Sequence, residues 1–579
     1  MPAEARYIDL YFRDYISRVV PGCSAKLLQV MLELSQALSR QHSCLDLANR
    51  EDKLDILSEL ATLEPFKQSN APVTLHGEKL YLRRYFQYEK CIVERITTLN
   101  SAMPIVDPIK LSEVLKSLFQ SQDKINWQQV AALQALTRKL TIITGGPGTG
   151  KTTTVARIIT LLNTLNDSPL QIRLAAPTGK AAMRLSQSLS SQVEATEGLR
   201  VQTLHRLLSV RRDGRSFRFN AENPIAADVL IVDEASMIDL PMMYRVLTAL
   251  PDKARLILVG DPDQLPSVET GNVLADLCTP TVGYSKDFTM LAKQMLGVSL
   301  TTSTPPHPLD DMRCHLRVSH RFLPDEGIGR LARNIAKKDI NIPSTGSGID
   351  VENPEALQGE HRSTLLLADF DHYFDGIRKQ RNNPAELAQL FEQSRLLTPM
   401  REGDLGVEEI NASIELALEA QGLKDPASGF YHGRPILILR NDYNLQLYNG
   451  DVGICIAAEE IDHPMVAFTN LSGETRLLLA SRLPPHETCF AMTVHKAQGS
   501  EFESVTLILP THLTHNAEQL LSRELVYTAI TRARRRVKLY TNGNIWKQCM
   551  ENSEPRVSGI NDFFQEPPSG TSKQLGLFE

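Results

Sequence analysis

The sequence predicts an α/β fold with two domains, each built on a parallel β-sheet flanked by helices, after a mostly helical N-terminal segment. From about residue 125 onward, short apolar runs alternate with helical segments, which is the pattern of strand–helix–strand units. A second set of such units follows a Gly-, Pro- and Ser-rich stretch at 343–359, which we take as the boundary between the two domains. Period-two apolar runs at 433–484 interrupt this second set and predict a small β-barrel insertion. The expected divisions are 1–108, 109–345 and 346–579, with the insertion at about 430–486 and a flexible tail at about 565–579.

The composition is that of an ordinary globular protein. The chain has 579 residues, of which 42% are hydrophobic and 22% charged, and its formal net charge is −6. This balance excludes a basic nucleic-acid coat protein, although local basic tracks remain compatible with it. The sequence has no apolar run of membrane-spanning length, and its charged first 20 residues contain no signal-peptide core. Its eight cysteines form no C-x-x-C pair, so we expect a cytoplasmic protein without a zinc site, an iron–sulfur cluster or disulfides.

The N-terminal segment predicts a packing or docking module. Residues 27–41 have helical apolar spacing, and residues 77–96 indicate a short strand that turns into a helix. No catalytic constellation is present in this part of the sequence.

Apolar runs place the strands of the two parallel sheets. A polar segment between two strands of the first domain, with Asp213-Gly214 as its turn, predicts a β-hairpin at about 207–221. Asn449-Gly450 predicts another hairpin turn inside the insertion. The expected strands are 140–144, 170–176, 228–233 and 255–261 in the first domain and 394–400, 503–510 and 535–541 in the second.

A phosphate-binding loop follows the first of these strands. GGPGTGKT (145–152) fits the pattern G-x-x-x-x-G-K-[ST] and runs into a helix, which is the context that this motif requires. Its backbone N–H groups and the helix N-terminus favour bound phosphate, so the sequence predicts an ATP site. Lys151 is expected to reach the β- and γ-phosphates, and Thr152 to hold Mg²⁺. The expected nucleotide-binding residues of this segment are Gly145, Gly146, Pro147, Gly148, Thr149, Gly150, Lys151, Thr152 and Thr153.

Acidic and amide side chains follow two further strands of the same sheet. Asp233 ends an apolar strand and is expected to hold Mg²⁺ through a coordinated water, while Glu234 is placed to polarise the attacking water. Gln264 follows another apolar strand, where it could contact both the γ-phosphate and that water.

These motifs, in this order, resemble those of superfamily 1 helicases. The resemblance spans about residues 109–545 and implies two RecA-like P-loop NTPase domains that hold ATP between them. It implies that INWQQVAAL (125–133) reads adenine through Gln129, and that Gly499 and Glu501 of TVHKAQGSEF (493–502) contact the nucleotide. By the same resemblance, SHRF (319–322) and YTAITRAR (527–534) supply Arg321 and Arg532 to the γ-phosphate. The implied single-stranded DNA contacts are Thr178, Gly179, His205, Thr493 and His495.

Within that superfamily, the sequence resembles the RecD family, the alpha subunits of RecBCD-type exodeoxyribonuclease V. Features of this kind are VDEASMIDLPMM (232–243), the long insert before SHRF and LYLRRYFQYE (80–89). About 50 residues separate Lys180 from Asp233, which leaves room for a hairpin but not for the large insertions of 3′→5′ relatives. The resemblance implies a 5′→3′ DNA helicase of superfamily 1B that works in double-strand break repair and recombination with RecB-like and RecC-like partners. It also implies that the nuclease lies in the RecB-like subunit.

Three other functions remain open at this stage. The chain could be a stand-alone RecD-like helicase, an ATP-binding regulatory subunit without motor activity, or an RNA helicase. The intact set of ATPase residues argues against the second, and the absence of visible N-terminal helix–hairpin–helix repeats argues against the first. The C-terminal QLGLF (574–578) also resembles a peptide that binds the bacterial sliding clamp, which predicts a further partner.

Overall fold

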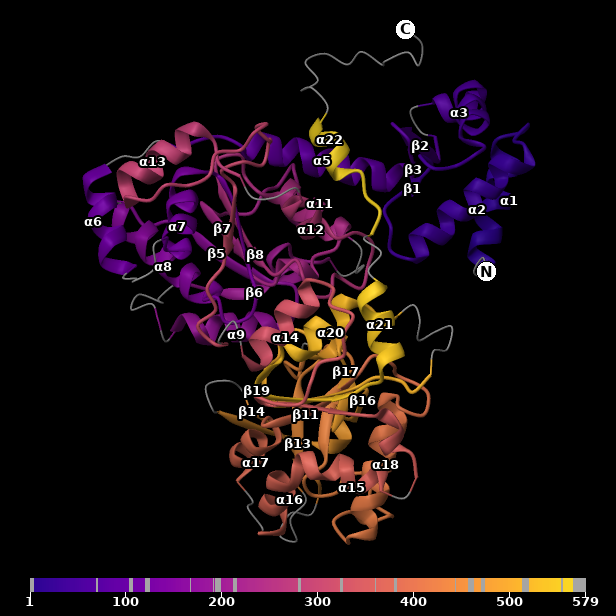
Figure 1. Cartoon of the computed structure of the whole chain (residues 1–579), viewed down its shortest axis with the longest axis vertical. Coiled ribbons are helices and arrows are strands. Elements are labelled where there is room, and N and C mark those ends of the chain that lie inside the picture. The colour runs from indigo at the N-terminus through magenta and orange to yellow at the C-terminus, as the bar shows by residue number, and fades with distance from the viewer. Residues whose placement is uncertain are drawn as a thin grey trace.

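The chain forms three bodies, which Figure 1 shows as an N-terminal domain beside a first α/β domain, with a second α/β domain below them. The structure is a computed structural model. It describes residues 5–565 except for 69–70, 104–107, 120–124, 167, 191, 193–198, 212–215, 280–282, 323–325, 360, 380–382, 443, 457–462, 470–473, 513–519 and 553–555.

The N-terminal domain combines helices with a small antiparallel sheet of order β1-β3-β2. Helix α2 begins where the Ser24 hydroxyl accepts a hydrogen bond from the Leu27 amide, which satisfies one free donor at the helix start. The strand and helix expected at 77–96 are β3 and α5. The elements are α1 (Tyr7–Val19), α2 (Ala25–Ser39), β1 (Leu45–Asp46), α3 (Lys53–Thr62), α4 (Glu64–Lys67), β2 (Val73–His76), β3 (Lys79–Leu82) and α5 (Arg83–Leu99).

Helix α5 joins this domain to the next one. Its C-terminal half buries Ile92, Val93, Ile96 and Leu99 in the core of the first α/β domain, next to helix α11. The N-terminal domain therefore does not end cleanly at 108, because the last helix that we assigned to it belongs to both cores.

The first α/β domain contains a six-stranded parallel sheet of order β6-β5-β7-β8-β4-β9. Its central strands are buried along their whole length, as expected for a sheet with helices on both faces. All four predicted strands of this sheet are present, and the short strands β6 and β9 are additional. The elements are α6 (Pro108–Leu118), α7 (Trp127–Thr137), β4 (Leu140–Gly145), α8 (Lys151–Leu165), β5 (Ile172–Ala176), α9 (Gly179–Ser190), β6 (Val201–Thr203), α10 (Leu204–Leu207), β7 (Val229–Val232), η1 (Ala235–Met237), α11 (Leu240–Ala249), β8 (Arg255–Gly260), α12 (Val273–Cys278), α13 (Lys286–Leu296) and β9 (Arg313–Leu316).

The segment predicted as a hairpin at about 207–221 folds back on itself. The amide of Arg211 donates to the Ser216 carbonyl at 2.9 Å, and the amide of Arg218 donates to the Ser209 carbonyl at 3.0 Å. An isolated bridge joins Val210 to Phe217. The predicted turn at 213–214 lies outside the described residues.

The second α/β domain contains a five-stranded parallel sheet of order β10-β19-β18-β11-β17. The three predicted strands are β11, β18 and β19. The elements of this domain outside the insertion are α14 (Gly327–Ala336), β10 (Ile349–Glu352), η2 (Pro354–Leu357), α15 (Arg362–Leu367), η3 (Ala368–Phe370), α16 (Asp371–Arg378), α17 (Pro384–Phe391), β11 (Ser394–Thr398), α18 (Val407–Ala420), β17 (Ala491–Thr493), η5 (His495–Ala497), β18 (Phe502–Ile508), α20 (Arg523–Ile530), β19 (Ala533–Tyr540) and α21 (Gly543–Glu551).

The boundary between the two α/β domains differs from the predicted one. Helix α14 buries Ile328, Leu331 and Ile335 in the second core, so the first domain ends before this helix rather than near 345. The Gly- and Pro-rich stretch 343–359 is not a linker, because strand β10 within it pairs with β19. Glycine and proline mark turns at both ends of a strand that is too short to show a period.

The insertion is an antiparallel sheet of order β15-β14-β13-β12-β16. Among the described residues, β15 and β16 each pair on one side only, so the predicted closed barrel is an open sheet in this part of the chain. The Asn449-Gly450 turn precedes β13 as expected, with Gly450 at a φ of +96°. The elements are β12 (Pro435–Ile438), β13 (Val452–Ile456), β14 (Met465–Thr469), β15 (Thr475–Leu479), η4 (Ala480–Arg482) and β16 (His486–Thr488).

The C-terminal segment returns to the first domain. After α21, the chain reaches helix α22 (Ile560–Gln565), which packs on α5 and α12. Figure 1 shows this helix beside α5, apart from α21. The predicted clamp-binding QLGLF at 574–578 lies outside the described residues and stays a prediction.

Two absences hold for the part of the chain that the structure describes. None of its helices combines the length and the apolar character needed to span a membrane. No group of three or more His, Cys, Asp or Glu side chains there is arranged to hold a metal ion. The eight cysteines are free thiols.

Replacing Asn411 with Leu should destabilise the second domain. The buried Asn411 amide donates to the carbonyls of Thr488 and Ala491 at 2.9 and 3.1 Å and accepts from the Ala491 amide at 2.8 Å. Leaving these three groups unpaired should cost about 2–4 kcal/mol of unfolding free energy. Urea unfolding of the full chain measures this loss of unfolding free energy. Ser413→Ala, at a partly exposed position of the same helix, should stay within about 0.5 kcal/mol of wild type, and an equally stable Asn411→Leu chain would contradict the prediction.

Candidate nucleotide-binding site

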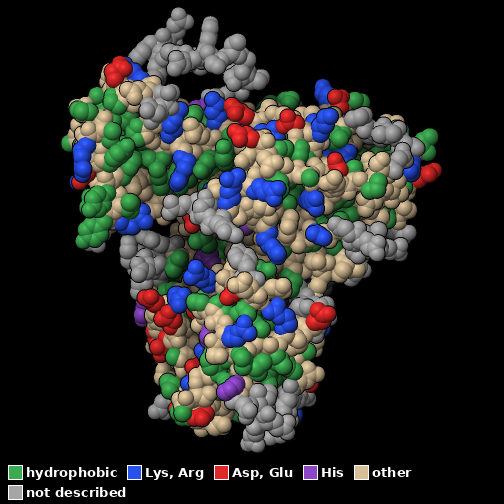
Figure 2. Space-filling model, turned by 180° about the vertical axis from the view of Figure 1, so that it is seen from behind, with side chains coloured by type: hydrophobic (Ala, Val, Ile, Leu, Met, Phe, Trp, Pro, Cys, Tyr) green, Lys and Arg blue, Asp and Glu red, His purple; other side chains and the backbone are tan. Residues whose placement is uncertain are grey.

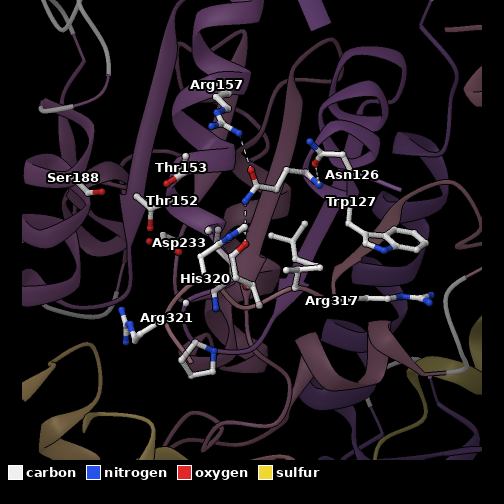
Figure 3. A pocket seen from close by; sticks show the side chains of 18 of the residues that line it. Asn126, Trp127, Thr152, Thr153, Arg157, Ser188, Asp233, Arg317, His320 and Arg321 are labelled. Atoms are coloured by element: carbon white, nitrogen blue, oxygen red, sulfur yellow. Dashed lines mark hydrogen bonds between the residues drawn. The ribbon is translucent and has the colours of Figure 1, made fainter. Parts of the chain in front are cut away.

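A pocket of about 610 Å³ lies where loops of the first domain meet Glu501 and Arg532 of the second domain. Its walls come from the phosphate-binding loop and from residues that follow strands β7, β8 and β9. The carboxyl ends of parallel strands meet at one edge of a sheet, which is why residues so far apart in the chain converge here. In Figure 3, Thr152, Asp233 and Arg321 lie on one side of the pocket, and Trp127 and Arg317 on the other.

The phosphate-binding loop depends on two glycines with left-handed backbone. Gly148 and Gly150 have φ of +74° and +80°. A Cβ at Gly148 would come within 2.3 Å of the Arg321 Cβ, and one at Gly150 within 2.3 Å of the Gln128 Nε2. Glycine is therefore required for both the conformation and the close approach of these neighbours.

Lys151 begins helix α8 and turns back along the loop. Its ammonium donates to the carbonyls of Gly145 at 2.7 Å and Gly146 at 3.2 Å. Phosphate oxygens would compete for these donors, because an ammonium binds an anion more strongly than a neutral carbonyl. Of the predicted loop residues, Pro147, Thr149, Gly150, Thr152 and Thr153 also line the pocket, together with Gly148.

Asp233 and Glu234 follow strand β7 and form a partly buried acidic pair. Burial, and the neighbouring Glu234 carboxylate, raise the pKa of Asp233 to about 7. Glu234 has a φ of +52°, an uncommon backbone for a residue with a side chain, and it lines the pocket beside Asp233. A divalent cation would relieve the charge repulsion, and Thr152 and Asp233 supply the hydroxyl and carboxylate oxygens that Mg²⁺ prefers.

Gln264 lies at the end of strand β8 and links the pocket to the second domain. Its amide donates to Asp261 at 3.1 Å, and the same carboxylate oxygen accepts from the Tyr527 hydroxyl of helix α20 at 3.2 Å. The next residue, Leu265, donates its amide to the Thr528 hydroxyl at 2.7 Å. The loop that carries Gln264 is thus held by both domains.

Arg321 contacts both the phosphate-binding loop and the second domain. Its Nη2 donates to the Glu501 carboxylate at 2.6 Å, and the preceding His320 amide donates to the Gly148 carbonyl at 2.7 Å. Burial alone would raise the pKa of Glu501, but the adjacent Arg321 and further arginines hold it at about 2. The Nη1 of Arg321 is buried without a hydrogen-bond partner among the described residues, so it is a free donor where a phosphate oxygen could bind.

Arg532 reaches the pocket from the second domain. Its guanidinium is buried and donates to the carbonyls of Thr528 and Ser500 at 3.1 and 3.4 Å. Both predicted arginines therefore line the same pocket as Lys151.

The amide that faces the pocket is Gln128 rather than the predicted Gln129. Gln128 donates to the Thr149 carbonyl at 3.1 Å and accepts from Arg157 at 2.8 Å, whereas Gln129 points toward the Leu115 carbonyl at 3.5 Å. Adjacent residues of a helix point about 100° apart, and the repeated amide in the sequence hides which one faces inward.

Trp127 and Arg317 complete this end of the pocket, and Arg317 is the one that the sequence did not single out. Arg317 stacks over the ring of Trp127 at 4.2 Å, and Figure 3 shows the two side by side. Trp127 also packs against the core of the first domain.

Gly499, expected to contact nucleotide, lies outside the pocket. It is buried with a φ of +70° near Ala181 of helix α9, while Glu501 of the same motif lines the pocket. Gly499 therefore has a packing position at the contact between the two domains.

The residues expected to bind DNA follow strand ends at the edges of the two sheets. Thr178, Gly179 and His205 follow β5 and β6, which are neighbours at one edge of the first sheet. Thr493 and His495 lie at and after β17, the edge strand of the second sheet. The structure thus gathers them into one group on each domain, separate from the pocket lining.

The fold and the pocket define a superfamily 1 helicase with two RecA-like domains. In agreement, residues 128–270 match the family model of an AAA domain, and residues 488–540 match that of a UvrD-like helicase C-terminal domain. A solved structure of the Pif1 helicase from Candida albicans is similar at 15% identity and a TM-score of 0.40, over 76% of this chain and 98% of that one.

The chain is 36% identical over 550 residues to the RecBCD enzyme subunit RecD of Haemophilus influenzae, which covers 87% of this chain and 83% of the relative. It is 29% identical to the ATP-dependent RecD2 DNA helicase of Deinococcus radiodurans, over 83% of this chain and 58% of the relative. The chain belongs to the RecD family.

Ionisation of Glu501 should stabilise the chain at neutral pH and much less in acid. Its pKa falls from an ordinary 4.5 to about 2 on folding, so this contribution is complete well above pH 4.5 and is lost as the pH falls toward 2. The difference in unfolding free energy between wild type and Glu501→Gln should shrink by about 2 kcal/mol from pH 7 to pH 3.

Denaturant unfolding at several pH values measures this difference. The control is Glu503→Gln, since Glu503 forms only exposed ion pairs with Arg534 and Arg535. A Glu501→Gln difference that is the same at both pH values would refute the prediction.

Proposed function

We propose that the chain is the motor of a RecBCD-type helicase–nuclease, in which ATP hydrolysis drives 5′→3′ movement along single-stranded DNA during double-strand break repair. The observation that carries this proposal is the convergence of Lys151, Glu234, Gln264, Arg321 and Arg532 on one pocket between two domains. Nuclease activity is assigned to the RecB-like partner.

In the proposed reaction, Lys151 binds the β- and γ-phosphates and Glu234 polarises the water that attacks the γ-phosphorus. Gln264 orients this water, and Arg321 and Arg532 stabilise the negative charge that spreads over the transferred group, a contribution of up to about 10³–10⁵ in rate. Thr152 and Asp233 would hold Mg²⁺, which neutralises phosphate charge when bound.

Hydrolysis becomes movement because the pocket lies between the domains. Bound ATP gives the unpaired Nη1 of Arg321 a partner and attracts the positive charge of Arg532 across the pocket, which favours closure. Loss of the γ-phosphate removes this attraction. The two groups of DNA-contacting residues, around Thr178 and around Thr493, would then grip the strand in alternation. Contacts to phosphate rather than to bases make such a grip independent of sequence.

The N-terminal domain supplies the proposed docking surface for the RecC-like partner. Helix α1 leaves Tyr7, Tyr11 and Tyr15 exposed at 85%, 66% and 52%, on one helical face, next to Ile8. Figure 2 shows hydrophobic side chains gathered at the free end of this domain. Exposed tyrosines at helical spacing are typical of an interface core.

A stand-alone helicase is the second candidate, because the chain aligns with more than half of the Deinococcus RecD2 helicase. The two candidates differ in whether unwinding requires partner subunits, which the following experiment decides.

DNA-stimulated ATP hydrolysis and unwinding should require Lys151. The purified chain, alone and with RecB-like and RecC-like subunits, is assayed on duplexes with a 5′ or a 3′ single-stranded tail, against Lys151→Gln. We expect unwinding only from the 5′ tail, and a fall of at least about 100-fold in hydrolysis for the variant. Arg378→Ala, an exposed substitution on α16, is the control. Unwinding from the 3′ tail, or hydrolysis that is insensitive to Lys151→Gln, would overturn the proposal.

Replacing Tyr7, Tyr11 and Tyr15 with Ser should weaken binding of the RecC-like subunit by about 100-fold or more, because buried tyrosines dominate interface energies. Titration calorimetry with the purified subunits measures this, and Leu54→Ser, which changes a residue that is 79% exposed on α3, is the matched control. If the triple variant binds the RecC-like subunit with wild-type affinity, the docking surface is not this face of helix α1.

A further inference from the structure

The C-terminal segment crosses from the second domain to the other two domains. Helix α21 packs in the second core through Ile545 and Trp546. Further along the chain, Ile560 and Phe564 of α22 are buried in the core of the first domain, and Phe563 stacks on His76 of the N-terminal domain at 4.0 Å. One short segment therefore contacts all three bodies.

Arg556 forms the densest set of hydrogen bonds in this segment. Its Nη1 donates to the carbonyls of Gly271 at 2.7 Å and Glu269 at 2.8 Å and to the Ser267 hydroxyl at 3.4 Å. Its Nη2 donates to the Ser267 carbonyl at 2.6 Å and to the side-chain oxygen of Gln41 in the N-terminal domain. The Gly271 amide donates to the Gln41 carbonyl at 3.0 Å, so these segments also contact each other.

The segment that Arg556 holds is the continuation of the Gln264 loop. Only two residues separate Gln264, in the nucleotide pocket, from Ser267. Between them, the Leu265 backbone is bonded to Thr528 at 2.7 Å and to Gln498 at 2.9 Å, both in the second domain. The loop is thus fixed at its start by the pocket, in the middle by the second domain and at its end by Arg556.

We propose that Arg556 is a positioning residue for ATP hydrolysis, which acts through residues 267–271 on the placement of Gln264 and ties the N-terminal domain to this loop. The inference rests on the proposed ATPase function. Gln264 must lie within hydrogen-bond distance of the attacking water, and errors of about 1 Å in such placements can cost about 100-fold in rate.

Arginine is suited to this position because its partners are several backbone carbonyls in different directions. The planar guanidinium presents five donors in a fixed arrangement, whereas a lysine ammonium has three donors on a flexible stem. Arg556→Lys should therefore keep the charge and lose part of the positioning, while Arg556→Ala loses all of it.

The test is a double-mutant cycle on DNA-stimulated ATP hydrolysis by the full chain, assembled with its partners if these are needed for activity. When the partners are present, the hydrolysis rate of the same complex carrying Lys151→Gln is subtracted, so that only hydrolysis by this chain is compared. Arg556→Ala should lower kcat by about 10-fold with KM for ATP within about twofold, and Arg556→Lys should lie between it and wild type. Gln264→Ala combined with Arg556→Ala should be no slower than Gln264→Ala alone, because both act on one group.

A second readout does not depend on activity. Amide hydrogen exchange of residues 265–271 and 41–43 should become faster in Arg556→Ala, with exchange elsewhere in the second domain unchanged. Arg378→Ala, whose arginine is half exposed and distant from the pocket, is the matched control and should change neither readout.

The outcomes separate the two proposals. A wild-type chain or complex without DNA-stimulated hydrolysis contradicts the proposed function, whatever Arg556 does. Active wild type with multiplicative losses in the double variant, or with unchanged kcat in Arg556→Ala, overturns the role of Arg556. Unchanged exchange at 265–271 in Arg556→Ala overturns it as well, even if kcat falls, because the loss then has another origin.

Discussion

The close approach of the phosphate-binding loop to residues 319–321 is the constraint on which the site depends. Arg321 can lie against the loop only because Gly148 has no Cβ, and the His320 amide and the Ser319 hydroxyl bond to loop carbonyls at 2.7 and 3.1 Å. This contact fixes one arginine beside the phosphate site and turns its other edge toward Glu501 of the second domain. The junction of the two domains is therefore built on the loop that binds the nucleotide.

Charge in the pocket is arranged for a ligand rather than for the stability of the free chain. Asp233 and Glu234 form a partly buried acidic pair, Glu234 adopts an uncommon backbone with positive φ, and one donor of Arg321 has no partner among the described residues. Each feature costs free energy in the free chain, and a divalent cation would relieve the acidic pair while a phosphate would pair the Arg321 donor. Such groups are typical of binding sites, where the free energy of ligand binding offsets the destabilisation of the free chain, and of sites that switch with nucleotide state.

Longer elements and local motifs could be predicted from the sequence, and features set by tertiary contacts could not. Strands β4, β7 and β8 are buried apolar runs between helices, and the glycine pattern of 145–152 has few other uses. Strands β6, β9, β10 and β17 have only three or four residues, too few for a period to show, and the sequence therefore predicts a domain boundary where β10 lies.

The errors in the site have the same physical origin. Gln128 and Gln129 are adjacent and chemically identical, and only the packing of helix α7 determines that Gln128 meets the loop at Gly150. The position of Gly499 depends on how the second domain packs against α9, a long-range contact that no local pattern encodes. The open sheet in place of a barrel reflects pairing at strand edges, which alternation of apolar residues does not determine.

Closure of the two α/β domains on ATP is the central claim, and distance measurement tests it most directly. Fluorescent labels at Met290→Cys on α13 and Leu416→Cys on α18, both exposed, report the separation of the domains in a chain whose partly exposed Cys23, Cys91 and Cys278 are replaced by Ser. A non-hydrolysable ATP analogue with Mg²⁺ should shift the energy-transfer efficiency of this chain, and should leave the Lys151→Gln form unchanged. An efficiency that does not respond to the analogue, although the analogue binds, would contradict the account.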